Sequence, residues 1–266
     1  MTPSSTALRL TGRDALPLLH RTTSNALADL APGGARPTLF CDFRGRLLHR
    51  AVVAVASDGA VWLLRADAPG PELAAAVDRM VFRDDVAIED RSAVLPFVLA
   101  PAPPGASGVL AERDGAPCVV AVGDGTLLAC DGRPALDEAA RVARLLPRHG
   151  HEVCDAFHPY EVGLGPDVHL AKGCFTGQEA LQRLITYASV RRRLARVTLT
   201  GTTARVPVEV RQGEERVGVL TSAADGDGLA VLTHAAAAPG TRLATEDGTT
   251  LEVVEAPDPA RPLGRD

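Results

Sequence analysis

The sequence predicts an α+β protein whose last part, from about residue 194, is entirely β. Up to about residue 190, apolar residues at helical spacing alternate with hairpin signals. After that point, short apolar strands follow one another with turn signals such as Asp225-Gly226-Asp227-Gly228 between them, which is typical of a small β-barrel or sandwich. The hairpins favour α+β layers over a doubly wound parallel sheet, and no Gly-x-Gly-x-x-Gly follows a strand, which argues against a Rossmann nucleotide site.

The expected elements follow from two kinds of pattern. A cap residue such as Asp14, followed by apolar residues, predicts a helix. Two apolar runs separated by a turn signal such as Asp58-Gly59 predict a hairpin. On these grounds we expect helices after Asp14, over 72–80 and over 136–146, hairpins joining 52–55 to 61–64 and 119–122 to 127–130, and later strands at 196–199, 206–210, 217–221, 229–232 and 251–254.

Composition and charge exclude several classes of protein. The net charge is −5 at pH 7, whereas general nucleic-acid binders carry a basic surface, so we expect no stable nucleic-acid binding. The 5 cysteines are an odd number without a Cys-x-x-Cys, which argues against a disulfide framework and against a zinc or cluster site. Reduced thiols suit the cytosol. There is no secretory pattern at the N-terminus and no apolar run near the roughly 20 residues of a membrane helix, so we expect a cytoplasmic protein that does not insert into membranes.

Two clusters of titratable residues allow more than one interpretation. His149 and His151 flank Gly150, but no third ligand stands at a clear spacing, so we expect no metal site. The basic run Arg191-Arg192-Arg193 suits either a bound polyanion or the solvated edge of a strand. We favour the strand edge, because charged edges block association between sheets.

The segment that most suggests chemistry is KGCFTGQE, residues 172–179, which we call the signature. Thr176 and Glu179 have the spacing of a capping box, and apolar residues follow at helical spacing, so a helix is expected to begin near Thr176. Cys174 would then lie just ahead of a helix N-terminus, where unpaired N–H groups and the helix dipole favour a thiolate. Lys172 adds a second positive charge, so Cys174 is the candidate reactive cysteine.

Each of these residues also has a purely structural interpretation. Glu179 could serve only as a cap, or could pair with Arg183 one turn later. A single cysteine is more often a small buried apolar residue than a nucleophile. Gly173 and Gly177 could serve loop geometry alone. These interpretations do not account for the gathering of a cation, a thiol, an amide and a carboxylate in one short segment.

The signature resembles that of the YgfZ family, folate-binding proteins related to the glycine-cleavage T-protein. The family pattern is Lys-Gly-Cys, an aromatic residue, any residue, Gly-Gln-Glu and an arginine four residues on. This chain matches each position, with Phe175 as the aromatic residue and Arg183 as the arginine. Weaker matches are Leu10-x-Gly12-x-Asp14-Ala15, Thr23-Ser24-Asn25, Asp42-x-x-Gly45-Arg46, Pro159-x-Glu161 and residues 218–222. The chain departs from the family at Ala188-Ser189, where an Arg-Gly pair is usual, and at Asn25, where an Asp is common.

The resemblance implies an α+β fold of two related parts, the first one discontinuous, and a small C-terminal β-barrel around a central folate-binding opening. The first part would comprise residues 1–45 and 132–190 and carry the signature. The second would comprise residues 46–131, and the barrel residues 191–256. We expect residues 257–266, rich in Pro, Arg and Asp, to form a disordered tail.

The resemblance further implies that the protein binds tetrahydrofolate or a derivative and supports the maturation or repair of iron–sulfur proteins, with a link to tRNA modification. A pterin offers N–H donors to a carboxylate or amide, and the anionic glutamate tail suits Lys or Arg. We expect the folate to be bound by Asn25, Lys172, Gln178, Glu179 and Arg183, and a thiol-dependent step to use Cys174 with Lys172. The other partners would be iron–sulfur client proteins, contacted transiently.

Two other functions fit the same resemblance. One is a folate-dependent aminomethyl- or methyl-transferase of the T-protein type; the cysteine of the signature speaks against it, because the T-protein lacks that cysteine. The other is a scaffold that binds partner proteins and keeps the folate pocket as a relic. The sequence therefore leaves open whether the protein is an enzyme.

Overall fold

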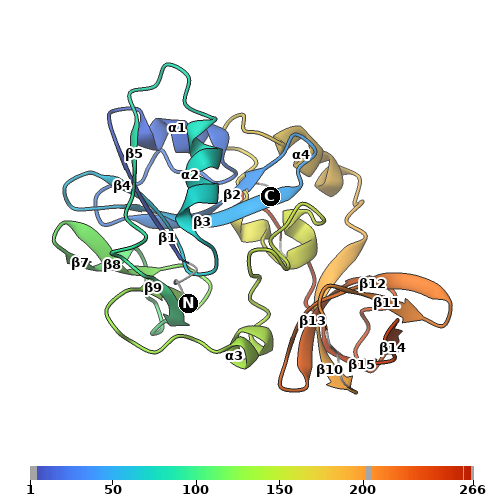
Figure 1. The fold of residues 1–266 in the computed structure, drawn as a ribbon. Helices are drawn as coiled ribbons and strands as arrows, with labels where there is room; N and C mark the ends of the chain where they lie inside the picture. Colours follow the sequence, from blue (N-terminus) through green and yellow to red (C-terminus); the bar gives the residue numbers. More distant parts are fainter. Residues whose placement is uncertain (1–4, 202–204, 260, 265–266) are drawn as a thin grey trace.

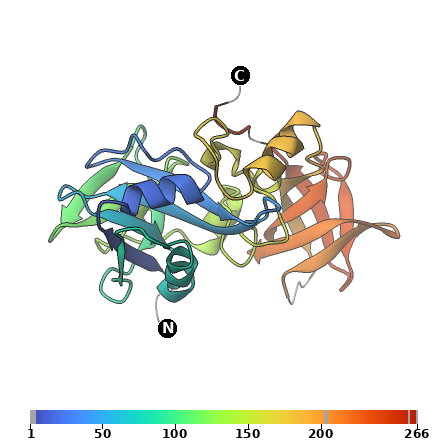
Figure 2. The same ribbon diagram turned by 90° about the horizontal axis from the view of Figure 1, so that it is seen from above.

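The computed structural model describes residues 5–201, 205–259 and 261–264, which form two sheets, a linking region with short helices and a closed barrel (Figures 1 and 2). The first sheet has five antiparallel strands in the order β2-β3-β4-β1-β5. These are β1 (Thr6–Thr11), β2 (Ala35–Cys41), β3 (Leu47–Val55), β4 (Val61–Arg65) and β5 (Ala87–Asp90). Two helices accompany it, α1 (Ala15–Thr22) and α2 (Gly70–Asp78).

The first sheet is covered on both faces, because side chains alternate along a strand. On one face Leu63 of β4 belongs to the same buried cluster as Leu18 of α1 and Leu73 of α2. On the other face Trp62 packs in a cluster with Val120, which belongs to the second sheet. The core is therefore a stack of helices, first sheet and second sheet, and Figure 1 shows α1 and α2 on the side of the first sheet away from β7, β8 and β9.

The second sheet has four strands in the order β6-β9-β8-β7. Its strands are β6 (Val98–Pro101), β7 (Val109–Arg113), β8 (Ala116–Ala121) and β9 (Thr126–Ala129). Both hairpins expected from the turn signals are present, as β3–β4 and as β8–β9.

Short helical elements connect the second sheet to the barrel: α3 (Glu138–Ala143), the 3-10 turns η1 (Pro159–Val162) and η2 (Gly165–Asp167), and α4 (Gln178–Thr186). The helix expected over 136–146 is shorter than predicted, because Leu145 adopts a positive φ of 51° and Pro147 follows it. The side chains of Tyr160 and Leu181 are fully buried in one cluster and fix η1 against α4. Among the described residues, no helix has the length and apolarity needed to cross a membrane.

The C-terminal part is a closed barrel of strand order β10-β13-β12-β11-β14-β15, which confirms the barrel expected from the short strands. The strands are β10 (Arg192–Thr200), β11 (Val208–Gln212), β12 (Glu215–Ala224), β13 (Asp227–Thr233), β14 (Arg242–Thr245) and β15 (Thr250–Glu255). Inward-facing apolar residues such as Val197, Leu220 and Leu251 fill its interior.

Two expectations about the ends of the parts need correction. The boundary expected at residue 45 falls inside the first sheet, since β2 and β3 form a hairpin across the turn 42–46 and β3 pairs onward with β4. The expected tail is ordered where it is described: the Leu263 N–H donates to the Val168 carbonyl at 2.8 Å, and the Leu170 N–H donates to the Leu263 carbonyl at 3.0 Å. Backbone pairing with the segment before the signature therefore holds the tail at Leu263, while residues 260, 265 and 266 lie outside the described residues.

Candidate functional site

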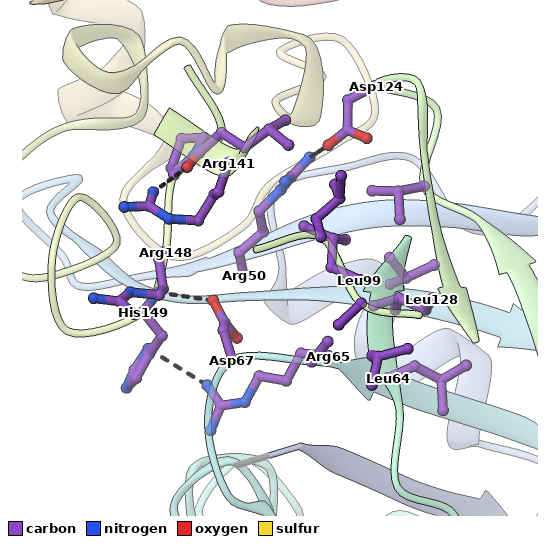
Figure 3. A pocket seen from close by; sticks show the side chains of 18 of the residues that line it. Arg50, Leu64, Arg65, Asp67, Leu99, Asp124, Leu128, Arg141, Arg148 and His149 are labelled. Carbon is purple, nitrogen blue, oxygen red and sulfur yellow. Dashed lines mark hydrogen bonds and ion pairs between the residues drawn. The ribbon is translucent and has the colours of Figure 1, made fainter. Parts of the chain in front are cut away.

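A cavity of about 460 Å³, which we call the central cavity, opens where the two sheets meet the segment that contains α3. The first sheet contributes Arg50 from β3 and Arg65 from β4, and the second sheet contributes Leu99 and Leu128 (Figure 3). The third wall is the segment 135–151, with Arg141, Arg148 and His149 among its lining residues. Aliphatic side chains and four guanidinium groups therefore share one enclosure.

Arg50 is held rigidly at the wall by two carboxylates. Its Nε donates to Asp167 Oδ2 at 2.7 Å, and a terminal nitrogen donates to Asp124 Oδ2 at 3.1 Å. Burial alone would lower the pKa of Arg50, but the charges of Asp167 and Asp124 outweigh it and raise that pKa. Arg50 is therefore a fixed cation, and its side chain is held by Asp167 of η2 and by Asp124 of the turn between β8 and β9.

Arg65 lies beside two stacked histidines, near the Nδ1 atom of each ring. One of its terminal nitrogens lies 3.3 Å from His49 Nδ1 and 3.5 Å from His149 Nδ1, and the two rings stack with centroids 5.3 Å apart. Burial first, and then the charge of Arg65, lower the pKa of His49 to about 4. The His49 ring is thus neutral near pH 7, and it can accept from Arg65 at Nδ1 while Nε2 carries the proton.

Those histidines and Glu72 also form a group with metal-ligand geometry, since one ligand atom of each lies within 4.8 Å of the others. His149 Nε2 is 3.3 Å from Glu72 Oε2, which suits an N–H donor facing a carboxylate. A metal on Nε2 would move the ring proton to Nδ1 and direct it at the guanidinium of Arg65, where two donors would meet. The hydrogen bonds therefore favour a proton-bearing network over a metal centre.

Arg141 connects the central cavity to the barrel. Its guanidinium donates to the Ser222 hydroxyl on β12 at 2.6 Å and to Glu152 Oε2 at 3.3 Å. Glu152 is completely buried, and its other oxygen accepts from the hydroxyls of Thr221 at 2.5 Å and Ser222 at 2.7 Å. A buried, fully bonded network of this kind fixes the orientation of the barrel relative to the cavity wall.

The residues expected from the sequence to bind the folate do not line the central cavity. Asn25 is buried, and its amide donates to the Pro37 carbonyl at 2.9 Å. Gln178 donates to the Leu170 carbonyl at 2.9 Å. Glu179 is 81% exposed at its side chain and pairs with Arg183, which is 69% exposed. The first two are therefore used for local structure and the last two face solvent.

The signature forms a separate, outward-facing site. Cys174 is exposed, and Lys172 is half-buried with its ammonium donating to the His20 carbonyl and lying 5.0 Å from the centre of the Phe175 ring. Burial lowers the pKa of Lys172 to about 8, and the neighbouring Cys174 partly opposes that shift. The expected capping box is absent: Gly177, with a φ of 83°, is the cap residue of α4 and makes no side-chain cap.

The sequence interpretation missed the arginines of the central cavity, because no motif gathers them. A usable signal was present in the local context: Arg50 interrupts the apolar run Leu47–Val55, and Arg65 ends the apolar run Val61–Arg65. A charged residue in a buried strand is rare unless it is paired, so an arginine at such a position indicates a polar site nearby.

Comparisons with known proteins support the resemblance found in the sequence. Residues 191–259 match the family model described as CAF17, C-terminal beta-barrel domain. The protein named "Putative transferase At1g60990, chloroplastic" from Arabidopsis thaliana is 33% identical over 89 residues, which is 34% of this chain. That match spans only 20% of the length of the Arabidopsis protein, so it bears on a segment and not on the whole.

The fold as a whole is similar to that of a solved aminomethyltransferase. The crystal structure of glycine cleavage system aminomethyltransferase T from Bartonella henselae superposes with a TM-score of 0.72, covering 96% of this chain and 83% of that chain at 18% sequence identity. The expected fold class is thereby confirmed. The barrel of this chain thus matches the model of the CAF17 C-terminal beta-barrel domain, and the chain has a fold similar to that of aminomethyltransferase T.

Proposed function

We propose that the protein binds a tetrahydrofolate in the central cavity. The composition of the wall carries the proposal: Leu64, Leu99 and Leu128 lie beside four guanidinium groups (Figure 3). A folate has a flat ring system, which aliphatic side chains accommodate, and an anionic tail, which arginines bind through paired hydrogen bonds. The volume of about 460 Å³ falls within the roughly 300–1,000 Å³ typical of small-molecule sites.

Two polar groups of the wall support this assignment. The Nε of Arg148 is buried and has no hydrogen-bond partner among the described residues, so it is a donor that a ligand carboxylate would satisfy. Asp67 accepts the His149 N–H with Oδ2 at 2.7 Å, which leaves Oδ1 to accept from a pterin N–H. A donor for the tail and an acceptor for the ring are thus both present.

The cavity fits the chemistry of the cofactor, which when bound would supply a carrier of one-carbon groups. The residues of this chain would bind the tail through Arg148, orient the ring against the aliphatic residues and exclude water from it. The fold similarity to an aminomethyltransferase agrees with a ligand of this class. The place proposed here for the folate differs from the signature, which is the place expected from the sequence.

Anaerobic calorimetric titration with tetrahydrofolate tests this assignment. We expect saturable binding that Arg148→Gln weakens about tenfold or more, the size of a lost hydrogen bond to a charged group. Arg44→Gln removes the same charge from an exposed turn outside the cavity and serves as the matched control. Cys174→Ala and Glu179→Gln should leave the affinity unchanged. Weakening by Glu179→Gln and not by Arg148→Gln would return the folate to the signature, and absence of saturable binding would reject the proposal.

We further propose that the signature acts on iron–sulfur client proteins from its own, exposed position. Cys174 is accessible from outside the molecule, as contact with another protein requires. Lys172 stands two residues before Cys174, and burial lowers the pKa of its amine to about 8. The amine can therefore take part in proton transfer beside the thiol. The proposed role is maturation or repair of the client, with the folate bound elsewhere in the same chain.

An aminomethyltransferase reaction is the second candidate, and the fold similarity to aminomethyltransferase T over 96% of the chain favours it. This reaction would also take place at the central cavity, with Asp67 placed to hold or receive a proton. Release of ammonia from an aminomethylated lipoyl carrier protein, dependent on tetrahydrofolate and abolished by Asp67→Asn, would support it. Folate binding without ammonia release would leave the accessory role.

A further inference from the structure

A second cavity, of about 330 Å³, lies on another part of the molecule and shares no lining residue with the central cavity. It lies where the turn between β2 and β3, the turn η1, the C-terminal end of α4 and the start of β10 meet, and we call it the arginine cavity. It is lined by Arg46, His158, Glu161, Leu184, Ser189, Val190, Arg191, Arg192 and Thr233.

The charges around the arginine cavity do not balance. Its one carboxylate, Glu161, is only 5% exposed and is already bound by Arg192, whose Nε and terminal nitrogen lie 2.8 and 3.1 Å from the two carboxylate oxygens. Arg46 lies 3.9 Å from Glu161 and donates instead to the Ala156 carbonyl at 2.8 Å. Among the described residues, the guanidinium groups of Arg46 and Arg191 therefore have no carboxylate of the cavity wall at hydrogen-bond distance, because Arg192 binds both oxygens of Glu161.

Arg191 is the freest of these cations. It is exposed, and within the described ranges its side chain makes no hydrogen bond or ion pair. Its neighbours in the basic run are occupied: Arg192 holds Glu161, and Arg193 bonds to His234 and to Asp258. The structure thus divides the run into two structural arginines and one with unused donors.

Two backbone carbonyls near the cavity are also occupied, so they do not compete with an added anion for the arginine donors. The last carbonyls of α4 would otherwise present partial negative charge. The Leu184 carbonyl accepts the Ser189 N–H at 2.9 Å, and the Val190 carbonyl lies 2.9 Å from His234 Nε2. What remains is a set of donors around a hollow whose other walls are Leu184, Val190 and the hydroxyl-bearing Thr233.

We propose that the arginine cavity binds the oxyanion group, carboxylate or phosphate, of a small organic molecule, with Arg191 and Arg46 as the contacting residues. Arginine provides planar paired donors that match either group. The aliphatic part of the wall accommodates the organic body of the ligand. The site is independent of the proposed folate site, because the two cavities have no residue in common.

Titration with inorganic phosphate and, separately, with glutarate tests the site, with chloride adjusted to keep the ionic strength constant. The imidazole signal of His158 reports on the cavity by NMR, and calorimetry gives the affinity. We expect saturable binding of at least one probe, weakened at least fivefold by Arg191→Gln and by Arg46→Gln. A response to phosphate alone would identify a phosphate ester as the natural ligand class, and a response to glutarate alone would identify a carboxylate.

The matched controls are Arg242→Gln and Arg44→Gln, which remove the same charge from exposed positions outside the arginine cavity. Both should bind the probe like the wild type. Equal weakening by a control and by Arg191→Gln would show general charge attraction and overturn the proposal, as would the absence of saturable binding in the wild type. Within the described ranges the Arg191 side chain makes no hydrogen bond or ion pair, so Arg191→Gln should fold and tests the proposal even where Arg46→Gln is unstable. Loss of binding in Arg148→Gln alone would place the anion in the central cavity and also overturn it.

Discussion

Arg50 and Asp167 join two parts of the molecule, since Arg50 lines the central cavity and Asp167 lies five positions before Lys172 of the signature. The bond between them is 2.7 Å long, and Asp167 is only 4% exposed. Burial raises the pKa of the Asp167 carboxyl, and the charge of Arg50 opposes that rise. The cavity and the approach to the signature therefore share one buried ion pair.

Removing one partner of this pair should be costly. We expect Asp167→Ala to lower the free energy of unfolding by about 3–5 kcal/mol, because it leaves the buried Arg50 with reduced compensation. Urea denaturation of the purified protein measures the change. The control is Asp29→Ala, which breaks the exposed pair with Arg36 and should cost less than about 1 kcal/mol. Equal losses in the two variants would contradict the buried character of the Arg50 pair.

Acid should destabilise the protein through His49. Its pKa is about 4 in the folded protein, against an ordinary value of 6.5, so the unfolded chain binds a proton between these values that the native state does not. The free energy of unfolding must then fall as the pH falls from 6.5 towards 4. Urea denaturation at intervals across this window should give a shallower fall for His49→Gln than for the wild type. Identical slopes would show that His49 titrates normally.

Lys172 should titrate near pH 8, well below an ordinary lysine, because burial disfavours its charged form. Since it is the only lysine in the sequence, reductive methylation followed by mass spectrometry of its peptide reports on this one side-chain amine. We expect the modification rate to rise with a midpoint near pH 8. A midpoint near the ordinary 10.5 would mean that the ammonium is solvated and not held against the His20 carbonyl.

Cys174 should be the first of the 5 thiols to react with iodoacetamide at pH 7.5. Cys41 is buried, and burial raises its pKa to about 12; burial also raises the pKa of Cys118, Cys130 and Cys154. Peptide mass spectrometry after brief alkylation measures the order of reaction.

In cells, Cys174→Ala should lower the activity of iron–sulfur enzymes, whereas Cys130→Ala serves as the control. Normal enzyme activity with Cys174→Ala would reject the proposed role of the thiol.

Local sequence patterns predicted the helices, hairpins and barrel. They did not reveal the central cavity, which forms from residues far apart in the sequence. The barrel followed from short strands and turn signals, and the likeness to the fold of the glycine cleavage T-protein followed from the resemblance of the signature. Arg50, Arg65 and Arg148 meet only in the folded chain, so no spacing could reveal the central cavity. The capping box failed for the same reason: the backbone of the turn 42–46 packs against the start of α4, where Gly177 becomes the cap residue in place of Thr176.

That close approach also has an evolutionary meaning. A Cβ on Gly177 would lie 2.4 Å from the Asp42 carbonyl oxygen, and one on Gly45 would lie 3.0 Å from the Leu181 side chain. Gly45 and Gly177 thus lie at one close contact between the β2–β3 turn and the start of α4. A side chain at either position would force the turn and the helix apart. In a set of related sequences we therefore expect these two positions to be inherited as a pair, so that a lineage which loses one glycine also remodels the other.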